Sequence, residues 1–129
     1  MDAQARYVSM VSASNVADGW RDRRGSGGLA MDIATNAIVC EGLSMPHSPR
    51  LHGGRLWLLN SGAGELGTVD PPRQAFEPRA FCPGFSRGLA FAGDHAIVGL
   101  SLARESRTFR DLPLDAALVK HGTHVVACW

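Results

Sequence analysis

This sequence of 129 residues has few cysteines, almost no net charge and no long apolar run. The three cysteines are an odd number without a C-x-x-C pair, which favours reduced thiols over a disulfide framework or a zinc site. The net charge of +1 offers no basic surface to nucleic acid or an anionic membrane. No apolar run approaches the ~20 residues of a membrane span, and the first residues lack the pattern of a signal peptide. We therefore expect a cytoplasmic protein without nucleic-acid or membrane partners.

What the sequence does contain is a repeated hairpin pattern. The segment SPRLHGGRLWLLNS (Ser48–Ser61) aligns with GLAFAGDHAIVGLS (Gly88–Ser101) at an offset of forty residues. In each copy an apolar segment is followed by a Gly-Gly or Gly-Asp turn and then by a second apolar segment. This order predicts a β-hairpin in each copy.

A second pair of segments repeats in the same way. GGLAMDIATNAIVCEGL (Gly27–Leu43) and GELGTVDPPRQAFEPRAFCPGF (Gly64–Phe85) both lead from Gly and Leu to an Asp, and then through a turn to an apolar strand near a Cys. The two pairs of repeated segments together define one complete unit, with strands at about 48–52, 55–60, 66–70 and 75–82. A partial unit precedes it, with strands at 7–12, 29–32 and 37–40. Another follows it, with strands at 89–91 and 95–100 and a further apolar segment, HVVACW, at 124–129.

Four short strands in about 40 residues is the length of one blade of a β-propeller. We therefore predict an all-β fold: a partial β-propeller of about two and a half four-stranded antiparallel blades, with a short helix near 113–120. The single domain over residues 1–129 divides into an incomplete blade at 7–45, a complete blade at 46–85 and an incomplete blade at 86–129. Since propellers typically have 4–8 blades, the chain is expected to be a fragment of a longer protein.

The continuous apolar run Leu56–Leu59 supports this architecture. A strand with one solvated face alternates apolar and polar residues, whereas a strand buried on both faces is apolar throughout. Blades lie between neighbouring blades, so both faces of each sheet are covered. We therefore expect Trp57 to lie in the core between two blades.

Two motifs imitate the signatures of enzymes. Gly62–Gly67 fits the G-x-G-x-x-G of a dinucleotide-binding turn, but that turn needs a helix next, and an Asp-Pro-Pro sequence follows instead. Gly84–Gly88 fits the G-x-S-x-G of a serine hydrolase, but the residues after it read as two strands. We interpret the first motif as a hairpin loop and keep a catalytic Ser86 as a minor alternative.

The candidate site lies on the loop-rich face of the predicted blades. The connections between blades share this face with the longest polar loops, where binding sites concentrate. His47 and Arg87 occupy matching positions in two such connections. The candidate ligand-binding residues are His47, Ser48, Arg50, Ser61, Glu65 and Arg87, with Trp20 as a further candidate. The alternative is that they have structural roles, with Arg50 and Arg87 paired to Glu65 or Glu41.

These side chains suit a small anionic or sugar-like ligand, or a protein partner, because arginine offers a bidentate fork to carboxylate or phosphate. No cofactor is predicted, since one His and one Glu are fewer ligands than a metal normally takes. A metal at the central channel of a longer protein remains an alternative. The first functional hypothesis is therefore a binding or interaction protein, and the second is a metal-dependent hydrolase of lactonase type or a lyase.

Three long stretches of the chain and one short one resemble one bacterial family, catalogued as domain of unknown function 4915. They are DGWRDRRGSGGLAMDI (Asp18–Ile33), GLSMPHSPRLHGGRLWLLNSGAGELGTVD (Gly42–Asp70), PGFSRGLAFAGDHAIVGLS (Pro83–Ser101) and LPLD (Leu112–Asp115). The resemblance covers the chain from about Tyr7 to Trp129. It implies a propeller fold in a longer protein, and it implies no particular reaction, substrate or catalytic residue.

Overall fold

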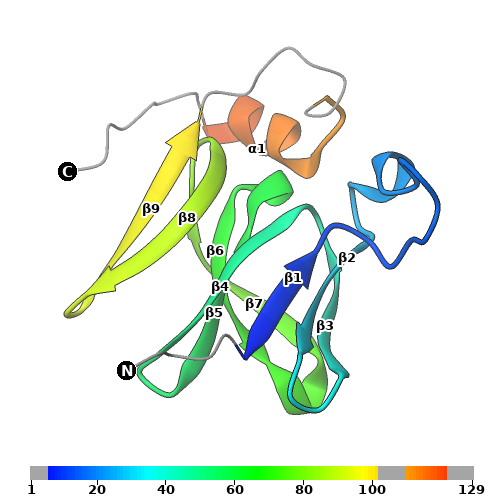
Figure 1. The fold of residues 1–129 in the computed structure, drawn as a ribbon. Coiled ribbons are helices and arrows are strands. Elements are labelled where there is room, and N and C mark those ends of the chain that lie inside the picture. Colours follow the sequence, from blue (N-terminus) through cyan, green and yellow to red (C-terminus); the bar gives the residue numbers. More distant parts are fainter. Residues whose placement is uncertain (1–5, 102–109, 122–129) are drawn as a thin grey trace.

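The structure is a computed structural model that describes residues 6–101 and 110–121. It is an all-β fold of three antiparallel sheets and one short α-helix (Figure 1). The first sheet contains β1 (Tyr7–Met10), β2 (Gly28–Asp32) and β3 (Ala37–Leu43). The central sheet contains β4 (Pro46–His52), β5 (Arg55–Asn60), β6 (Glu65–Asp70) and β7 (Ala75–Phe81). The third sheet contains β8 (Phe85–Ala92) and β9 (His95–Ser101), and α1 spans Pro113–His121.

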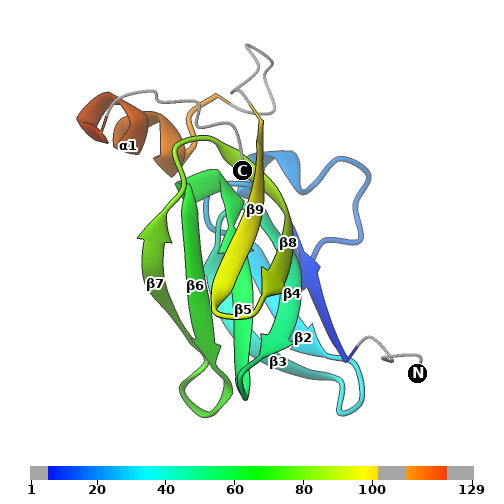
Figure 2. The ribbon, with the colours of Figure 1, turned by 90° about the vertical axis from the view of Figure 1, so that its left-hand side faces the viewer.

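The three sheets stack face to face as neighbouring blades would, and strands within each sheet pair in sequence order. Figure 2 shows β8 and β9 in front of the central sheet, with β2 and β3 behind it. The arrangement confirms the predicted all-β, partial propeller-like fold and the short helix near 113–120. The apolar segment HVVACW at 124–129 lies outside the described residues. Within the described ranges, no helix is long and apolar enough to cross a membrane.

The strands beside the connections between blades are longer than predicted. Strands were expected at 37–40, 48–52 and 89–91, whereas β3 continues to Leu43, β4 begins at Pro46 and β8 begins at Phe85. The physical reason is a pair of β-bulges. The register shifts between His47 and Arg50 on β4, and between Ser86 and Leu89 on β8. Because a bulge interrupts the alternation of side chains, the strand before it does not show the strand pattern in the sequence.

The core confirms that the central sheet is buried on both faces. One cluster fills the space between the first and central sheets: Ala30, Val39, Cys40, Leu43, Leu56, Leu58 and Val69. The other fills the space between the central and third sheets: Leu59, Leu66, Cys82 and Leu89, with Trp57, Phe91, Val98 and Leu100 packed against it. Successive residues of β5 therefore enter opposite clusters, as the two-residue period of a strand requires. Burial of each such leucine contributes about 1.5–3 kcal/mol.

The glycines of the G-x-G-x-x-G motif have structural roles. No helix follows them: Ser61–Ala63 form a single 3₁₀ turn, η2, and β6 begins at Glu65. Gly64 ends that turn with φ of 70°, where a Cβ would lie 2.9 Å from the carbonyl oxygen of Cys82. A Cβ on Gly67 would collide with the carbonyl oxygen of Glu77 on the neighbouring strand. These close backbone contacts explain why glycine occupies both positions, and binding of a pyrophosphate is not needed to explain it.

The two ends of the sheets differ, and this difference positions the candidate site. The hairpin turns are short and lie at one end. At the other end lie α1, η2 and the long segment between β1 and β2, which contains the 3₁₀ helix η1 (Arg21–Arg23) (Figure 1). A third apolar cluster holds this end together: Met45, Phe85, Leu112 and Leu114, with Val11, Trp20 and Leu118 packed against it.

Candidate functional site: a pocket at the loop-rich end

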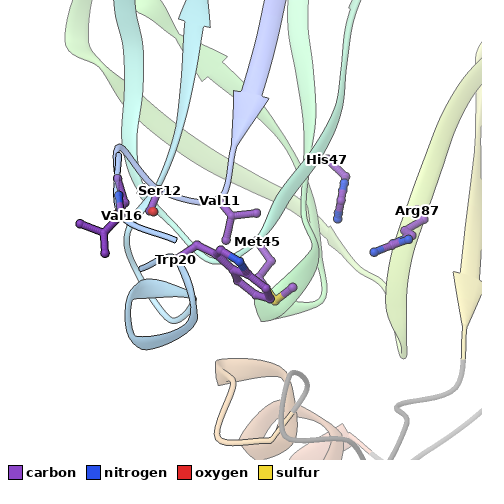
Figure 3. Close-up of a pocket in the computed structure, with 8 residues that line it drawn as sticks. Val11, Ser12, Val16, Trp20, Met45, His47 and Arg87 are labelled. Carbon is purple, nitrogen blue, oxygen red and sulfur yellow. The ribbon is translucent and has the colours of Figure 1, made fainter. Parts of the chain in front are cut away.

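A pocket of about 350 Å³ opens at the loop-rich end of the sheets (Figure 3). Three parts of the chain form its wall: the segment after β1, the start of β4 and the start of β8. The lining residues are Val11, Ser12, Ser14, Val16, Trp20, Met45, His47 and Arg87. The pocket thus contains His47, Arg87 and Trp20, three of the residues that the sequence analysis selected.

The segment after β1 is a folded loop that brings Trp20 to the pocket. Its turn is closed by a hydrogen bond from the N–H of Gly19 to the carbonyl of Val16, at 3.0 Å. Arg21 pairs with Asp18 at 3.1 Å, and its guanidinium carbon lies 4.7 Å from the centroid of the Trp20 ring. Trp20 also packs against the third apolar cluster, so its indole is half-buried with one part exposed to the pocket.

His47 and Arg87 approach the pocket from adjacent sheets, and Arg87 extends from β8 toward His47 (Figure 3). Both side chains contact the ring of Phe85. The His47 ring contacts it edge-on, with centroids 5.8 Å apart, and the Arg87 guanidinium carbon lies 5.7 Å from its centroid. Both polar side chains therefore contact the same ring, with His47 half-buried and Arg87 exposed.

The polar groups of the pocket are one cation and several neutral groups. Burial lowers the pKa of His47, and the positive charge of Arg87 lowers this pKa further, so the imidazole is neutral at neutral pH. Among residues 6–101 and 110–121, no carboxylate forms an ion pair with Arg87. The buried atoms Ser12 Oγ and His47 Nε2 have no hydrogen-bond partner in that part of the chain.

The other predicted residues lie outside the pocket lining. Ser48 forms part of the bulge on β4, where its Oγ accepts a hydrogen bond from the Gly88 N–H. Arg50 is exposed and donates to the carbonyl of Pro49. Ser61 is fully buried and its Oγ donates to the carbonyl of Ser86 at 2.6 Å.

Glu65 also has a local role. Its Oε2 accepts a hydrogen bond from Asn60 Nδ2 at 3.0 Å. In the described residues neither Glu65 nor Glu41 pairs with Arg50 or Arg87, so the alternative ion pairs considered from the sequence are not formed there.

Ser86 has the environment of a structural serine. It lies within β8, it is fully buried, and its Oγ donates to Ser61 Oγ at 3.1 Å. The nucleophile of the G-x-S-x-G motif stands exposed on a turn between a strand and a helix, and Ser86 has neither feature. The part of the chain that the structure describes also brings no three His, Cys, Asp or Glu side chains together as a metal site would require.

Sequence reasoning missed the apolar wall of the pocket. Val11, Val16 and Met45 contribute to it, and Ser12 and Ser14 add hydroxyl groups. A signal was present, because Val16 and Trp20 are the large apolar residues of an otherwise polar loop. Their spacing within a loop indicates no fixed direction, however, so the pattern alone does not show that both line the pocket that contains His47.

Comparison with known proteins identifies the family. The chain belongs to the family described as Domain of unknown function (DUF4915), whose model matches residues 1–128. This result confirms the resemblance inferred from the sequence. No curated protein and no solved structure matched the chain.

Proposed function

With membership of this family as the premise, we propose that the chain is a ligand-binding protein whose site is the pocket at the loop-rich end of the sheets. The observation that carries the proposal is the convergence of Arg87, neutral His47 and Trp20 on one concavity. Small-molecule sites are concave and mostly apolar, with a few polar groups that fix the orientation of the ligand. We further propose that the sheets are successive blades of a cytoplasmic β-propeller, which serves as the rigid scaffold of this site.

Two buried polar atoms without a hydrogen-bond partner support the proposal that the pocket binds a ligand. Most buried polar atoms in proteins have a hydrogen-bond partner. Ser12 Oγ and His47 Nε2 have none among the described residues, although both belong to lining residues. A ligand with hydrogen-bonding groups would supply the missing partners.

The same atoms favour binding over serine hydrolysis. An activated serine needs a base within about 2.6–3.2 Å of its hydroxyl. Ser12 and His47 both line the pocket, but Ser12 Oγ and His47 Nε2 form no hydrogen bond with each other. The metal-dependent alternative gains no support either, because the described part of the lining offers one imidazole and no carboxylate.

The test is a screen of a metabolite library against the purified chain, read as a shift in melting temperature. It compares two variants that add the same bulky side chain. Val16→Trp fills the pocket from an exposed position at its edge, where the valine is 69% exposed. Val119→Trp is the matched control, because Val119 is 89% exposed and lies on α1 away from the lining.

Compounds that bind the pocket raise the melting temperature of the wild type and of Val119→Trp, but not that of Val16→Trp. Compounds that stabilise all three proteins equally bind elsewhere. If every hit behaves in this second way, or if no compound stabilises the wild type, the proposed function is wrong.

A further inference from the structure

We propose that the ligand of this pocket is a small organic monocarboxylate with an apolar body, bound with its carboxylate on Arg87. This inference rests on the proposed function and names the class of ligand. It follows from the charge, the apolar wall and the size of the pocket.

The charge of the lining selects an anion. Arg87 is the one charged side chain in the described lining, and no described carboxylate neutralises it. Arg87 is exposed, and its guanidinium carbon lies 5.7 Å from the centroid of the Phe85 ring. A guanidinium pairs with a carboxylate through two parallel hydrogen bonds, and such charge-assisted bonds are roughly twice as strong as neutral ones.

The charge of the lining also limits the ligand to one negative charge. His47 does not add a second cation, because burial and the charge of Arg87 lower its pKa. A dianion such as a phosphate ester would leave one charge uncompensated in a partly buried site, which is costly. The neutral imidazole instead suits the second carboxylate oxygen or a neighbouring hydroxyl or carbonyl group, whereas the Ser12 hydroxyl lies on the side of the pocket away from Arg87 (Figure 3).

The opposite wall selects an apolar body. Val11, Val16, Trp20 and Met45 lie on the side of the pocket away from Arg87 (Figure 3). A sugar would need a hydrogen-bond partner for each buried hydroxyl, and on this side the described lining offers few, chiefly the Ser12 hydroxyl and the Trp20 indole N–H. The volume of about 350 Å³ is near the lower end for ligand pockets, so the body is the size of one aromatic ring or a short branched chain.

The test compares acids with their primary amides, which have nearly the same shape but no charge. The probes are aryl- and alkyl-carboxylates such as 3-phenylpropionate and 4-methylpentanoate, each paired with its amide, together with glucose and inorganic phosphate. Calorimetry measures the Kd of each probe for the wild type, Arg87→Gln and Arg50→Gln. Arg50→Gln is the matched control, because it removes the same charge from an exposed position three residues beyond His47 on β4, outside the lining.

In the wild type and in Arg50→Gln, the acids are expected to bind about tenfold or more tightly than the amides, as charge-assisted hydrogen bonds imply. In Arg87→Gln the acids weaken to the level of the amides, whose own Kd does not change. Equal binding of acid and amide by the wild type, or tighter binding of glucose or phosphate, would overturn the ligand class while leaving the pocket as a binding site. Absence of binding by every probe would overturn the ligand class as well, and the library screen then decides separately whether the pocket binds at all.

Discussion

The backbone N–H of Gly88 donates a hydrogen bond to Ser48 Oγ at 3.2 Å, and the two residues are separated by 40 positions, one repeat of the sequence. Both have positive φ, 54° for Ser48 and 80° for Gly88, and both lie in the bulges of β4 and β8. The bond therefore joins equivalent points of adjacent sheets. Because His47 and Arg87 directly precede these residues, the same bond keeps the two polar side chains of the pocket in register.

The first prediction concerns this junction. Gly88→Ala should lower the free energy of unfolding by about 1–2 kcal/mol, because a side chain in the left-handed conformation is strained. A Cβ at Gly88 would meet no atom within 4 Å, so the cost comes from the backbone alone. Gly25→Ala is the control, since Gly25 has equally open surroundings without a positive φ. Urea unfolding measures both variants, and an equal stability of the two would contradict the strain at Gly88.

A second prediction tests the burial of the central sheet on both faces. Leu58 and Leu59 are fully buried, the first against the first sheet and the second against the third sheet. Leu58→Ala and Leu59→Ala should each reduce the free energy of unfolding by about 2–5 kcal/mol, the usual cost of a cavity in a core. Leu51→Ala, at a position that is 56% exposed, should change it by about 0.5 kcal/mol or less. A small effect at either Leu58 or Leu59 would mean that one face of the sheet is not packed in solution.

The pH dependence of stability provides a third prediction. The pKa of His47 is lowered in the folded protein from its ordinary value of 6.5, first by burial and then by the charge of Arg87. The unfolded chain therefore binds this proton more readily, so the contribution of the neutral imidazole is present above about pH 6.5 and is lost as the pH falls through the folded pKa. His47→Gln should make the loss of unfolding free energy below that pH less steep.

Two controls distinguish this effect from a general acid sensitivity. His95→Gln is the matched control, because His95 is exposed at the start of β9 and lies outside the pocket lining. In a titration followed by NMR, Arg87→Gln should raise the pKa of His47 toward its ordinary value. A pKa of His47 at or above 6.5 in the wild type would contradict the buried placement of its ring.

The sequence indicated the fold more completely than the site, because the two depend on different interactions. The hairpins follow from a repeat whose turns and apolar runs are local, and the run Leu56–Leu59 reports directly on burial at both faces. The alignment of His47 with Arg87 also follows from that repeat. The bulges could not be predicted from the sequence, because the two residues with positive φ, Ser48 and Gly88, are of different types.

The rest of the pocket depends on contacts between distant parts of the chain. Val11, Met45 and Trp20 pack against Phe85 and α1, and no local pattern encodes that packing. Ser61 shows the converse. Its position at the end of β5 suggested a ligand contact, but its hydroxyl faces the neighbouring sheet and bonds the carbonyl of Ser86.

The central claim, that this pocket binds a small carboxylate, is tested most directly by mapping the contact of 3-phenylpropionate in solution by NMR. The account predicts that the indole N–H of Trp20, the ring protons of His47 and the guanidinium of Arg87 shift together and saturably. The indole N–H of Trp57 should not shift, because it is bonded to the carbonyl of His52 on the turn side of the central sheet. Saturable shifts confined to the surroundings of Trp57, or an unchanged spectrum, would contradict the claim.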